Sequence, residues 1–338
     1  MEMGNDVALS VRNLKTYIYT NNRCNRALDG VSFEIRQGKT LCIVGESGCG
    51  KSVTAASIMQ LLPTLSRIED GEITYHGPDG PVRIDALERD GAKMRAIRGK
   101  EIAMIFQDPM TALNPVYSIG FQIKEMLRYH TSLGRKDRHS KAIDLLRSMG
   151  IPLPERRVDE YPHLYSGGMR QRAMIAIAMS CNPRILIADE PTTALDVTIQ
   201  AQIFELMDTL KRENGTAIML ITHDMGVVAE LADDVAVMYM GNIVEAGPVG
   251  KVLRKPVHPY TRALLDSIPV LGRGKDQEIK AIPGQTPDPY NRPTGCQFAD
   301  RCAYRVSACD EMPPETMVAD DHRVMCWRYQ EFMADAAE

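Results

Sequence analysis

The chain has 338 residues, of which 44% are hydrophobic and 25% are charged, and its formal net charge at pH 7 is -4. These values are typical of a globular protein with about two domains. The acidic balance gives no electrostatic reason to expect nucleic acid as a partner. The N-terminus lacks the pattern of a signal peptide, and no apolar run reaches the roughly 18 residues that a membrane span needs. The sequence therefore predicts a cytoplasmic protein, in which stable disulfides are rare.

Short apolar runs alternate with segments of helical periodicity along the chain. Such alternation is typical of an α/β fold with a mostly parallel sheet. The glycine and asparagine at 241 and 242 favour a hairpin. The predicted elements are, in chain order, a strand at 40–44, a helix at 51–62, a strand at 101–106, several helices between 108 and 183, strands at 184–190 and 216–224, and a hairpin at 236–247.

The sequence "GESGCGKS", Gly45 to Ser52, lies between the first predicted strand and helix. This context and the G-x-x-x-x-G-K-S pattern indicate a phosphate-binding loop. Its glycines let backbone N–H groups surround phosphate oxygens, and the helix N-terminus favours the anion. Lys51 would reach the β- and γ-phosphates, and Ser52 would bind Mg²⁺. A glycine-rich turn without a ligand is the alternative. The predicted ATP-binding residues here are Gly45, Glu46, Ser47, Gly48, Cys49, Gly50, Lys51, Ser52 and Val53.

Two further sequences supply the rest of a nucleotide site. In "ILIADEP", Asp189 ends an apolar strand and would bind Mg²⁺, while Glu190 would act as the general base for a water. In "YSGGMRQR", Ser166 is a predicted helix N-cap followed by two glycines, which favours a second anion site. Because the chain's own phosphates already have a loop, this second site is most simply explained by the nucleotide of a partner chain.

With these motifs in this order, residues 7–250 resemble the ATP-binding subunits of ATP-binding cassette (ABC) transporters. The resemblance implies a P-loop nucleotide-binding domain with a RecA-like core, an antiparallel β subdomain and a helical subdomain at about 108–183. It also assigns roles to single residues. Tyr17 (or Tyr19) would stack on adenine, Gln107 would contact Mg²⁺ and the attacking water, and His223 would contact the γ-phosphate. The remaining roles are Mg²⁺ binding by Ser52, Gln107 and Asp189, catalysis by Glu190, a signature motif of Ser166, Gly167, Gly168 and Met169, and a dimer-loop role for Asp196.

Two positions depart from the usual signature, since Tyr165 and Met169 stand where the family most often has Leu and Gln. The serine and glycines that would contact phosphate remain. Glu190 and His223 are both present, so the resemblance implies ATP hydrolysis at this chain's own site, provided that a partner supplies the opposing signature.

Four longer stretches, among them "YPHLYSGGMRQR" and "HPYTRALLDSIP", resemble the ATPases of bacterial dipeptide and oligopeptide importers. The implied partners are a second ATPase subunit that forms a heterodimer with this chain, two transmembrane permease subunits and, indirectly, an extracytoplasmic solute-binding protein. The implied location is peripheral, at the cytoplasmic face of the inner membrane. An importer ATPase for nickel, glutathione or oligosaccharides is an alternative. A soluble ABC ATPase of translation or DNA repair is disfavoured by the single cassette.

The remaining segment, 251–338, carries four of the chain's eight cysteines: Cys296, Cys302, Cys309 and Cys326. Their spacing is looser than that of usual zinc sites and matches neither common ferredoxin pattern. The form "GCQFADRCAYRVSAC" resembles the C-terminal region of peptide-importer ATPases, and this resemblance implies a [4Fe-4S] cluster. Zinc and unligated cysteines are the alternatives. The predicted organisation is thus a nucleotide-binding domain at 1–250 and a cysteine-containing C-terminal region at 251–338.

Overall fold

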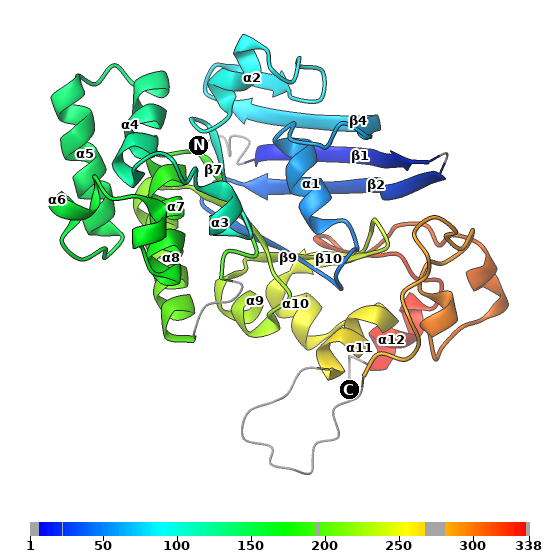
Figure 1. Ribbon diagram of the computed structural model, residues 1–338. Coiled ribbons are helices and arrows are strands. Elements are labelled where there is room, and N and C mark those ends of the chain that lie inside the picture. Colours follow the sequence, from blue (N-terminus) through cyan, green and yellow to red (C-terminus); the bar gives the residue numbers. More distant parts are fainter. Residues whose placement is uncertain (1–6, 22, 193–196, 268–280, 336–338) are drawn as a thin grey trace, which may run out of the picture. The chain divides into compact units, whose positions relative to one another are not determined.

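The computed structural model describes the whole chain except residues 1–6, 22, 193–196, 268–280 and 336–338 (Figure 1). The chain forms two compact units, each made of separate stretches of sequence. Unit 1 contains Met1–Leu9, Ile35–Thr40 and Tyr75–Ile221, and unit 2 contains Ser10–Glu34, Leu41–Thr74 and Thr222–Glu338. The predicted division at residue 250 stays a prediction, because these units follow packing rather than order along the chain.

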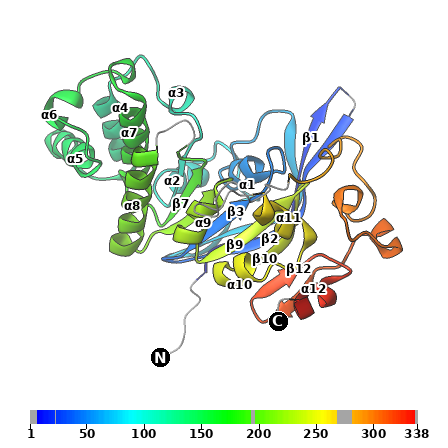
Figure 2. The same ribbon diagram turned by 90° about the horizontal axis from the view of Figure 1, so that it is seen from below.

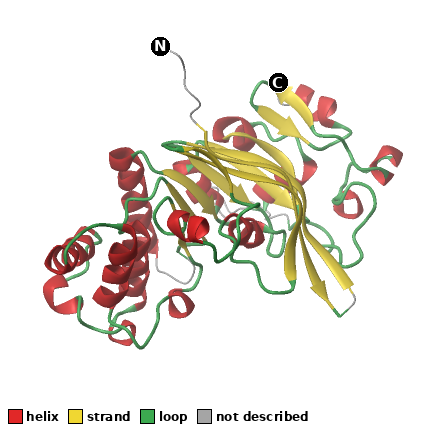
Figure 3. Cartoon of the chain, turned by 90° about the horizontal axis from the view of Figure 1, so that it is seen from above, coloured by secondary structure: helices red, strands yellow, loops and turns green. Residues whose placement is uncertain are grey.

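Unit 1 joins a short parallel sheet to a group of helices. The strands lie in the order β8-β7-β6, with Ile185 beside Ile102 on one side and beside Ala217 on the other. The neighbouring helices α4, α5 and α7 pack against one another (Figure 3). The elements are β5 (Gly80–Arg83), α2 (Ala92–Ile97), β6 (Ile102–Ile105), α3 (Pro109–Ala112), α4 (Ile119–His130), α5 (Arg135–Ser148), α6 (Pro154–Arg157), η1 (Pro162–Leu164), α7 (Gly167–Met179), β7 (Ile185–Asp189), α8 (Val197–Asn214) and β8 (Ala217–Ile221).

Unit 2 contains strands of two sheets. Their orders are β2-β1-β4 in one sheet and β11-β12-β10-β9-β3 in the other. β3 is parallel to β9, whereas β10 is antiparallel to both β9 and β12. The elements are β1 (Val7–Thr20, whose first residues belong to unit 1), β2 (Arg23–Arg36), β3 (Thr40–Val44), α1 (Lys51–Ile58), β4 (Ser66–Gly77), α9 (Met225–Leu231), β9 (Asp234–Tyr239), β10 (Asn242–Pro248), α10 (Val249–Arg254), α11 (Pro259–Asp266), η3 (Ala299–Arg301), η4 (Ser307–Asp310), β11 (Thr316–Ala319), β12 (His322–Val324) and α12 (Tyr329–Asp335).

The predicted α/β class is confirmed, and each predicted strand exists within three residues of its expected bounds. The helix expected at 51–62 ends earlier, at Ile58. Gln60 adopts a left-handed φ of 53°, and the Leu61 N–H donates to the Ala56 carbonyl at 2.8 Å. This is a left-handed helix ending of the kind that glycine usually makes, so a glutamine gave no signal for it.

The C-terminal region is more regular than its sequence suggests. β12 pairs with β10, so that Glu245 lies opposite Val324, and β11 pairs with β12 (Figure 2). Val257, Val324 and Phe332 form a small apolar cluster of their own. This region therefore extends the sheet of unit 2 instead of forming a separate appendage.

Buried polar groups tie the same region together around Glu245, which is 1% exposed. Its two carboxylate oxygens accept the N–H groups of Val257 at 2.8 Å and His258 at 3.0 Å, and the His322 ring nitrogen lies 2.9 Å from Oε1. His258 in turn begins α11, where its Nδ1 accepts the Tyr260 N–H at 3.0 Å. The buried side chains of Glu245, His258 and His322 thus each have a hydrogen-bond partner, as most buried polar groups do.

The burial of His258 predicts an acid-sensitive fold. Burial lowers the pKa of His258 from 6.5 to about 4, against a smaller raising effect of Glu245. The unfolded state therefore takes up a proton first, so the stabilisation is complete above pH 6.5 and is lost as the pH falls toward 4. We expect His258 to contribute a fall of roughly 3 kcal/mol in the free energy of unfolding across that window. Asparagine keeps an N-cap acceptor without titrating, so His258→Asn should flatten this slope in denaturant unfolding. An unchanged slope would contradict the prediction.

Candidate nucleotide site

The phosphate loop, residues 45–52, belongs to unit 2 and joins β3 to α1. Gly45 and Gly50 have φ angles of +150° and +111°. A Cβ on Gly45 would lie 2.2 Å from the Met238 carbonyl oxygen, and one on Gly50 would lie 2.7 Å from that of Ala27. Both positions therefore require glycine for two independent reasons, conformation and close packing. The loop ends at the N-terminus of α1, where backbone N–H groups favour an anion.

Lys51 turns back over this loop. Its ammonium group is buried and donates to the Gly45 carbonyl at 2.8 Å and to the Glu46 carbonyl at 3.1 Å. Ser52 is exposed, so its hydroxyl is open to a ligand. Cys49 is buried, and burial raises the pKa of its thiol, so it remains protonated and packs as a small side chain.

The predicted catalytic residues of unit 1 meet at the end of β7. Asp189 is the last residue of the strand and is buried. Glu190 follows with a left-handed φ of 45°, a rare conformation for a non-glycine residue. Its carboxylate accepts the Gln107 amide N–H at 2.9 Å, and its backbone N–H donates to the Ile221 carbonyl at 2.9 Å. Strained backbone of this kind is concentrated at functional sites. The structure thus brings together Gln107 and Glu190, which belong to two separate sequence motifs.

The predicted signature motif begins α7, also in unit 1. The Ser166 hydroxyl is the N-cap and accepts the Met169 N–H at 3.3 Å. Gly167 is exposed, and a Cβ there would meet nothing within 4 Å. Tyr165 points the other way: it is buried, and its hydroxyl donates to the Arg157 carbonyl at 2.7 Å. The unusual tyrosine therefore packs inside the helical part, while Ser166 and Gly167 are exposed.

Gln171 is a residue that sequence reasoning missed. It is buried in α7, and its side-chain amide donates to the Pro191 carbonyl, just after Glu190. It therefore links the signature helix to the end of β7. No local signal in the sequence marks it, because Gln171 stands between Arg170 and Arg172.

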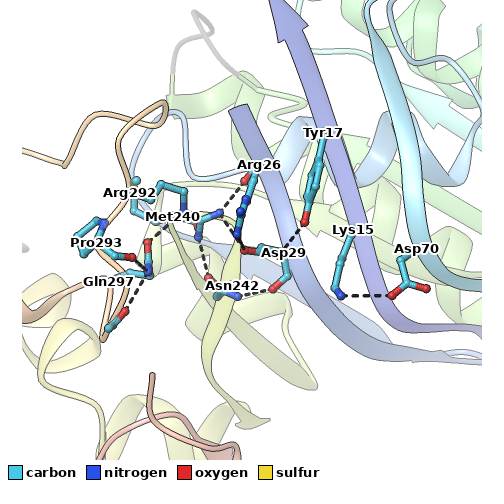
Figure 4. Close-up of polar contacts among 11 residues, drawn as sticks. Lys15, Tyr17, Arg26, Asp29, Asp70, Met240, Asn242, Arg292, Pro293 and Gln297 are labelled. Atoms are coloured by element: carbon cyan, nitrogen blue, oxygen red, sulfur yellow. Dashed lines mark hydrogen bonds and ion pairs between the residues drawn. The ribbon is translucent and has the colours of Figure 1, made fainter. Parts of the chain in front are cut away.

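Tyr17 lies in unit 2 (Figure 4). It borders a cavity of about 990 Å³. Its hydroxyl donates to Asp29 at 3.2 Å, and the Arg26 guanidinium lies 5.8 Å from its ring centre. Burial and Asp29 raise the pKa of Tyr17. Tyr19, the alternative, borders the same cavity and donates to Glu69 at 2.7 Å. The cavity is large enough for a nucleoside.

The positions of the other predicted site residues say less about their roles. His223 is exposed in unit 2, immediately before Asp224, whose carboxylate caps α9. Asp196 lies outside the described residues. The expected Mg²⁺ ligands Ser52, Gln107 and Asp189 offer hydroxyl, amide and carboxylate oxygens, which are the hard donors that Mg²⁺ prefers. Ser52 belongs to unit 2, and the other two belong to unit 1.

Comparison with known proteins identifies the class of this site. The sequence profile described as "ABC transporter" matches residues 28–193, and that described as "Oligopeptide/dipeptide transporter, C-terminal region" matches residues 244–309. Among solved structures, a dimeric ATP-binding cassette bound to ADP and Pi superposes with a TM-score of 0.63 at 26% identity, covering 71% of this chain and 98% of the other. CbiO1 of Clostridium perfringens, part of an ABC transporter complex, gives 0.59 at 26% identity, covering 73% and 91%. These matches define an ATP-binding cassette ATPase.

Relatives that match nearly the whole chain identify a narrower family within this class. A probable peptide ABC transporter ATP-binding protein of Sinorhizobium fredii is 49% identical over 96% of both chains. The oligopeptide transport ATP-binding protein AppD of Bacillus subtilis is 49% identical over 96% of this chain and 97% of its own. The chain therefore belongs to the ATP-binding subunits of peptide-importing ABC transporters, ATPases that couple hydrolysis to transport. Membership implies ATP and Mg²⁺ as ligands, dimerisation and permease partners. None of the helices in the described ranges combines the length and apolar character needed to cross a membrane.

The iron–sulfur prediction is wrong. Within the described part of the chain, no group of three or more His, Cys, Asp or Glu side chains is arranged to hold a metal ion, which also removes the zinc alternative. Cys296, Cys302, Cys309 and Cys326 do border one cavity, but its volume is about 10 Å³, roughly the space of a single water. The relatives are named as peptide transport proteins and not as iron–sulfur proteins.

Burial affects the ionisation of three of these thiols. Burial raises the pKa of Cys296 to about 11 and that of Cys326 to about 12, and it also raises that of Cys302. Protonated thiols behave as small apolar side chains. The cysteines here pack with Phe298 and Trp327 around the small cavity. The resemblance in cysteine spacing suggested metal ligands, whereas in the structure the four cysteines are packed side chains.

Proposed function

We propose that this chain is the ATP-hydrolysing subunit of an importer for di- and oligopeptides, with residues 1–250 as its nucleotide-binding domain and 251–338 as its C-terminal region. The observation that carries hydrolysis is the Glu190 carboxylate, held by Gln107 at the end of β7. Residues 45–53 would bind the phosphates, Tyr17 would stack on adenine, and Ser52, Gln107 and Asp189 would hold Mg²⁺. Glu190 would take the proton from the attacking water, and His223 would contact the γ-phosphate.

Mg²⁺, when bound, would neutralise charge between the β- and γ-phosphates. The chain's own residues supply the rest. Lys51 would exchange its bonds to the loop carbonyls for bonds to phosphate oxygens. Glu190, whose amide partner fixes its orientation, would accept a proton from a positioned water. Electrostatic stabilisation and positioning then account for most of the rate increase.

Two copies, or this chain and a related ATPase, would pair head to tail, with Ser166, Gly167, Gly168 and Met169 facing the partner's nucleotide and Asp196 in the crossing loop. ATP would stabilise the closed pair, and hydrolysis would release it, so that the nucleotide shifts a two-state equilibrium. The exposure of Gly167 and the open space around it support this role.

The permease subunits would dock on unit 1 near the segment 106–121. This segment exposes an apolar group of side chains rather than burying them, which marks an interaction surface. Tyr117 and Phe121 stack with ring centres 4.5 Å apart. The exposed members are Phe106, Met110, Val116, Tyr117 and Phe121. The chain would thus lie at the cytoplasmic face of the inner membrane, and an extracytoplasmic binding protein would supply the peptide.

Peptide uptake in cells that lack the gene tests the cargo. Restoring the chain should restore uptake of di- and oligopeptides, and restoring the Glu190→Gln variant should not. If the cells recover uptake of nickel, glutathione or oligosaccharides instead, the peptide assignment is wrong although the ATPase assignment stands.

The signature role predicts a specific defect for Gly167→Asp. A carboxylate at this exposed position would repel the partner's phosphates, so we expect ATPase activity of the assembled transporter to fall by at least about 100-fold. ATP binding by the isolated chain and its unfolding midpoint should change little, because the side chain enters open space.

Gly250→Asp is a matched control. Gly250 also lies in the first turn of a helix, α10, and a Cβ there likewise meets nothing within 4 Å. Its activity should remain at the wild-type level. Equal losses in both variants would show that the effect of Gly167→Asp is not specific to the signature.

A further inference from the structure

Arg301, in the short helix η3, connects the C-terminal region to the phosphate loop within unit 2. Its Nη1 lies 2.6 Å from Glu46 Oε2 and its Nη2 lies 3.0 Å from Glu46 Oε1. These two parallel bonds form a bidentate guanidinium–carboxylate pair, the strongest common ion-pair geometry. The Arg301 side chain is only 5% exposed, so solvent screens the pair weakly.

The Arg301 guanidinium is itself held in place by the C-terminal region. Its Nε donates to the Pro283 carbonyl at 2.9 Å, and Nη1 also lies 3.3 Å from the Tyr239 hydroxyl. The rings of Tyr239 and Phe298 lie within 6 Å of the guanidinium carbon. Because the group is already ordered, little rotamer entropy opposes its bonds to Glu46.

Glu46 is also held through its backbone. Its N–H donates to the Tyr260 hydroxyl at 2.9 Å, and its carbonyl accepts from Lys51 at 3.1 Å. The side chain, the backbone N–H and the backbone carbonyl of Glu46 therefore each have a hydrogen-bond partner. Two of the partners, Arg301 and Tyr260, come from beyond residue 250, and Tyr260 is fully buried against Tyr239 and Phe298.

The C-terminal region also contacts residues next to Tyr17, the predicted adenine-stacking residue (Figure 4). Arg292 donates to the Arg26 carbonyl at 2.7 Å and to Asn242 at 2.8 Å, and it lies 3.6 Å from Asp29, the carboxylate that accepts the Tyr17 hydroxyl. Its Nε donates to Gln297, which fixes the local chain. The segment that Arg292 anchors lines the cavity beside Tyr17.

We propose that Arg301 and Tyr260 are positioning residues that hold the phosphate loop in its nucleotide-binding conformation, so that the C-terminal region sets the affinity for ATP. This inference rests on the proposed ATPase function. A loop that is ordered before binding loses less conformational entropy when the triphosphate arrives. Both residues contact Glu46 and would act through it.

Equilibrium binding of Mg²⁺–ATP and of ADP to the full chain tests the proposal. Arg301→Gln should raise the Kd for ATP on the order of tenfold. Arg301→Lys retains the charge but not the bidentate geometry, so it should show an intermediate Kd. Tyr260→Phe, which removes only the hydroxyl, should also weaken binding. In ATPase assays of the assembled transporter, KM should rise while kcat at saturating ATP stays near the wild-type value.

A double-variant cycle separates positioning from general damage. If Arg301 acts through Glu46, then Glu46→Gln and Arg301→Gln combined should bind ATP no more weakly than the poorer single variant. Arg305→Gln is the matched control, because the partners of Arg305, Asp300 and Asp310, lie in the same C-terminal segment. Its Kd should equal that of the wild type.

The outcomes are distinguishable. If the wild-type chain binds no ATP, the proposed function itself fails. If the wild type binds ATP and Arg301→Gln binds it equally well, the positioning role fails alone. The positioning role also fails if Arg305→Gln weakens ATP binding as much as Arg301→Gln does. It fails too if the effects of Glu46→Gln and Arg301→Gln on ATP binding are additive.

Discussion

Replacing Glu190 with glutamine is expected to reduce ATP turnover by about 10²- to 10⁴-fold, the usual contribution of a general base. The amide is nearly the same size as the carboxylate but cannot accept the proton of the attacking water. Binding of ATP should stay within a few fold of the wild type, because the phosphate loop lies elsewhere in the chain. Single-turnover hydrolysis by the assembled transporter and equilibrium ATP binding measure the two effects.

Gln107 provides the companion test. Its amide donates to Glu190 at 2.9 Å, so Gln107→Ala should lower turnover less than Glu190→Gln does, because it removes the orientation of the base and not the base. Wild-type turnover from Glu190→Gln would refute the catalytic assignment.

Gly45→Ala is expected to have the largest effect on the phosphate loop. The new Cβ would lie 2.2 Å from the Met238 carbonyl oxygen, at a φ of +150°. Conformational strain of about 1–2 kcal/mol and overpacking of about 1–3 kcal/mol should lower the free energy of unfolding by about 3 kcal/mol. Because the loop must shift to relieve the contact, ATP binding should also be lost. Denaturant unfolding and equilibrium nucleotide binding are the measurements.

Gly48→Ala isolates the conformational contribution. Gly48 also has a positive φ, +80°, but a Cβ there meets nothing within 4 Å. Only the conformational cost of about 1–2 kcal/mol should remain. If the two variants are destabilised equally, the close contact at Gly45 does not matter.

The nucleotide motifs were predictable because their chemistry demands particular residue types at fixed local spacing. The loop 45–52 needs glycines at its turns and a lysine at the helix start, and the structure places Gly45 and Lys51 in those roles. The strand that ends at Asp189 and the N-cap at Ser166 follow from equally local patterns.

What could not be predicted depends on contacts between residues far apart in sequence. Glu46 and Arg301 are 255 positions apart, and no local pattern reports that pairing. The short strands β11 and β12 owe their structure to pairing with β10, not to their own periodicity. The cysteine spacing of the C-terminal region led to the wrong prediction, because spacing along the chain does not show how the side chains are arranged in space.

The pairing of β12 with β10 also protects the protein from self-association. A strand at the margin of a sheet offers unpaired N–H and C=O groups to any other extended chain, and β10 reads "NIVEAGP", largely apolar and mostly buried. With β12 in place, Glu245 and Ala246 are matched to Val324 and Arg323, and the outermost strand is β11, which is four residues long and half exposed. A chain cut short before residue 316 would present β10 itself as the margin and would be prone to aggregate through it.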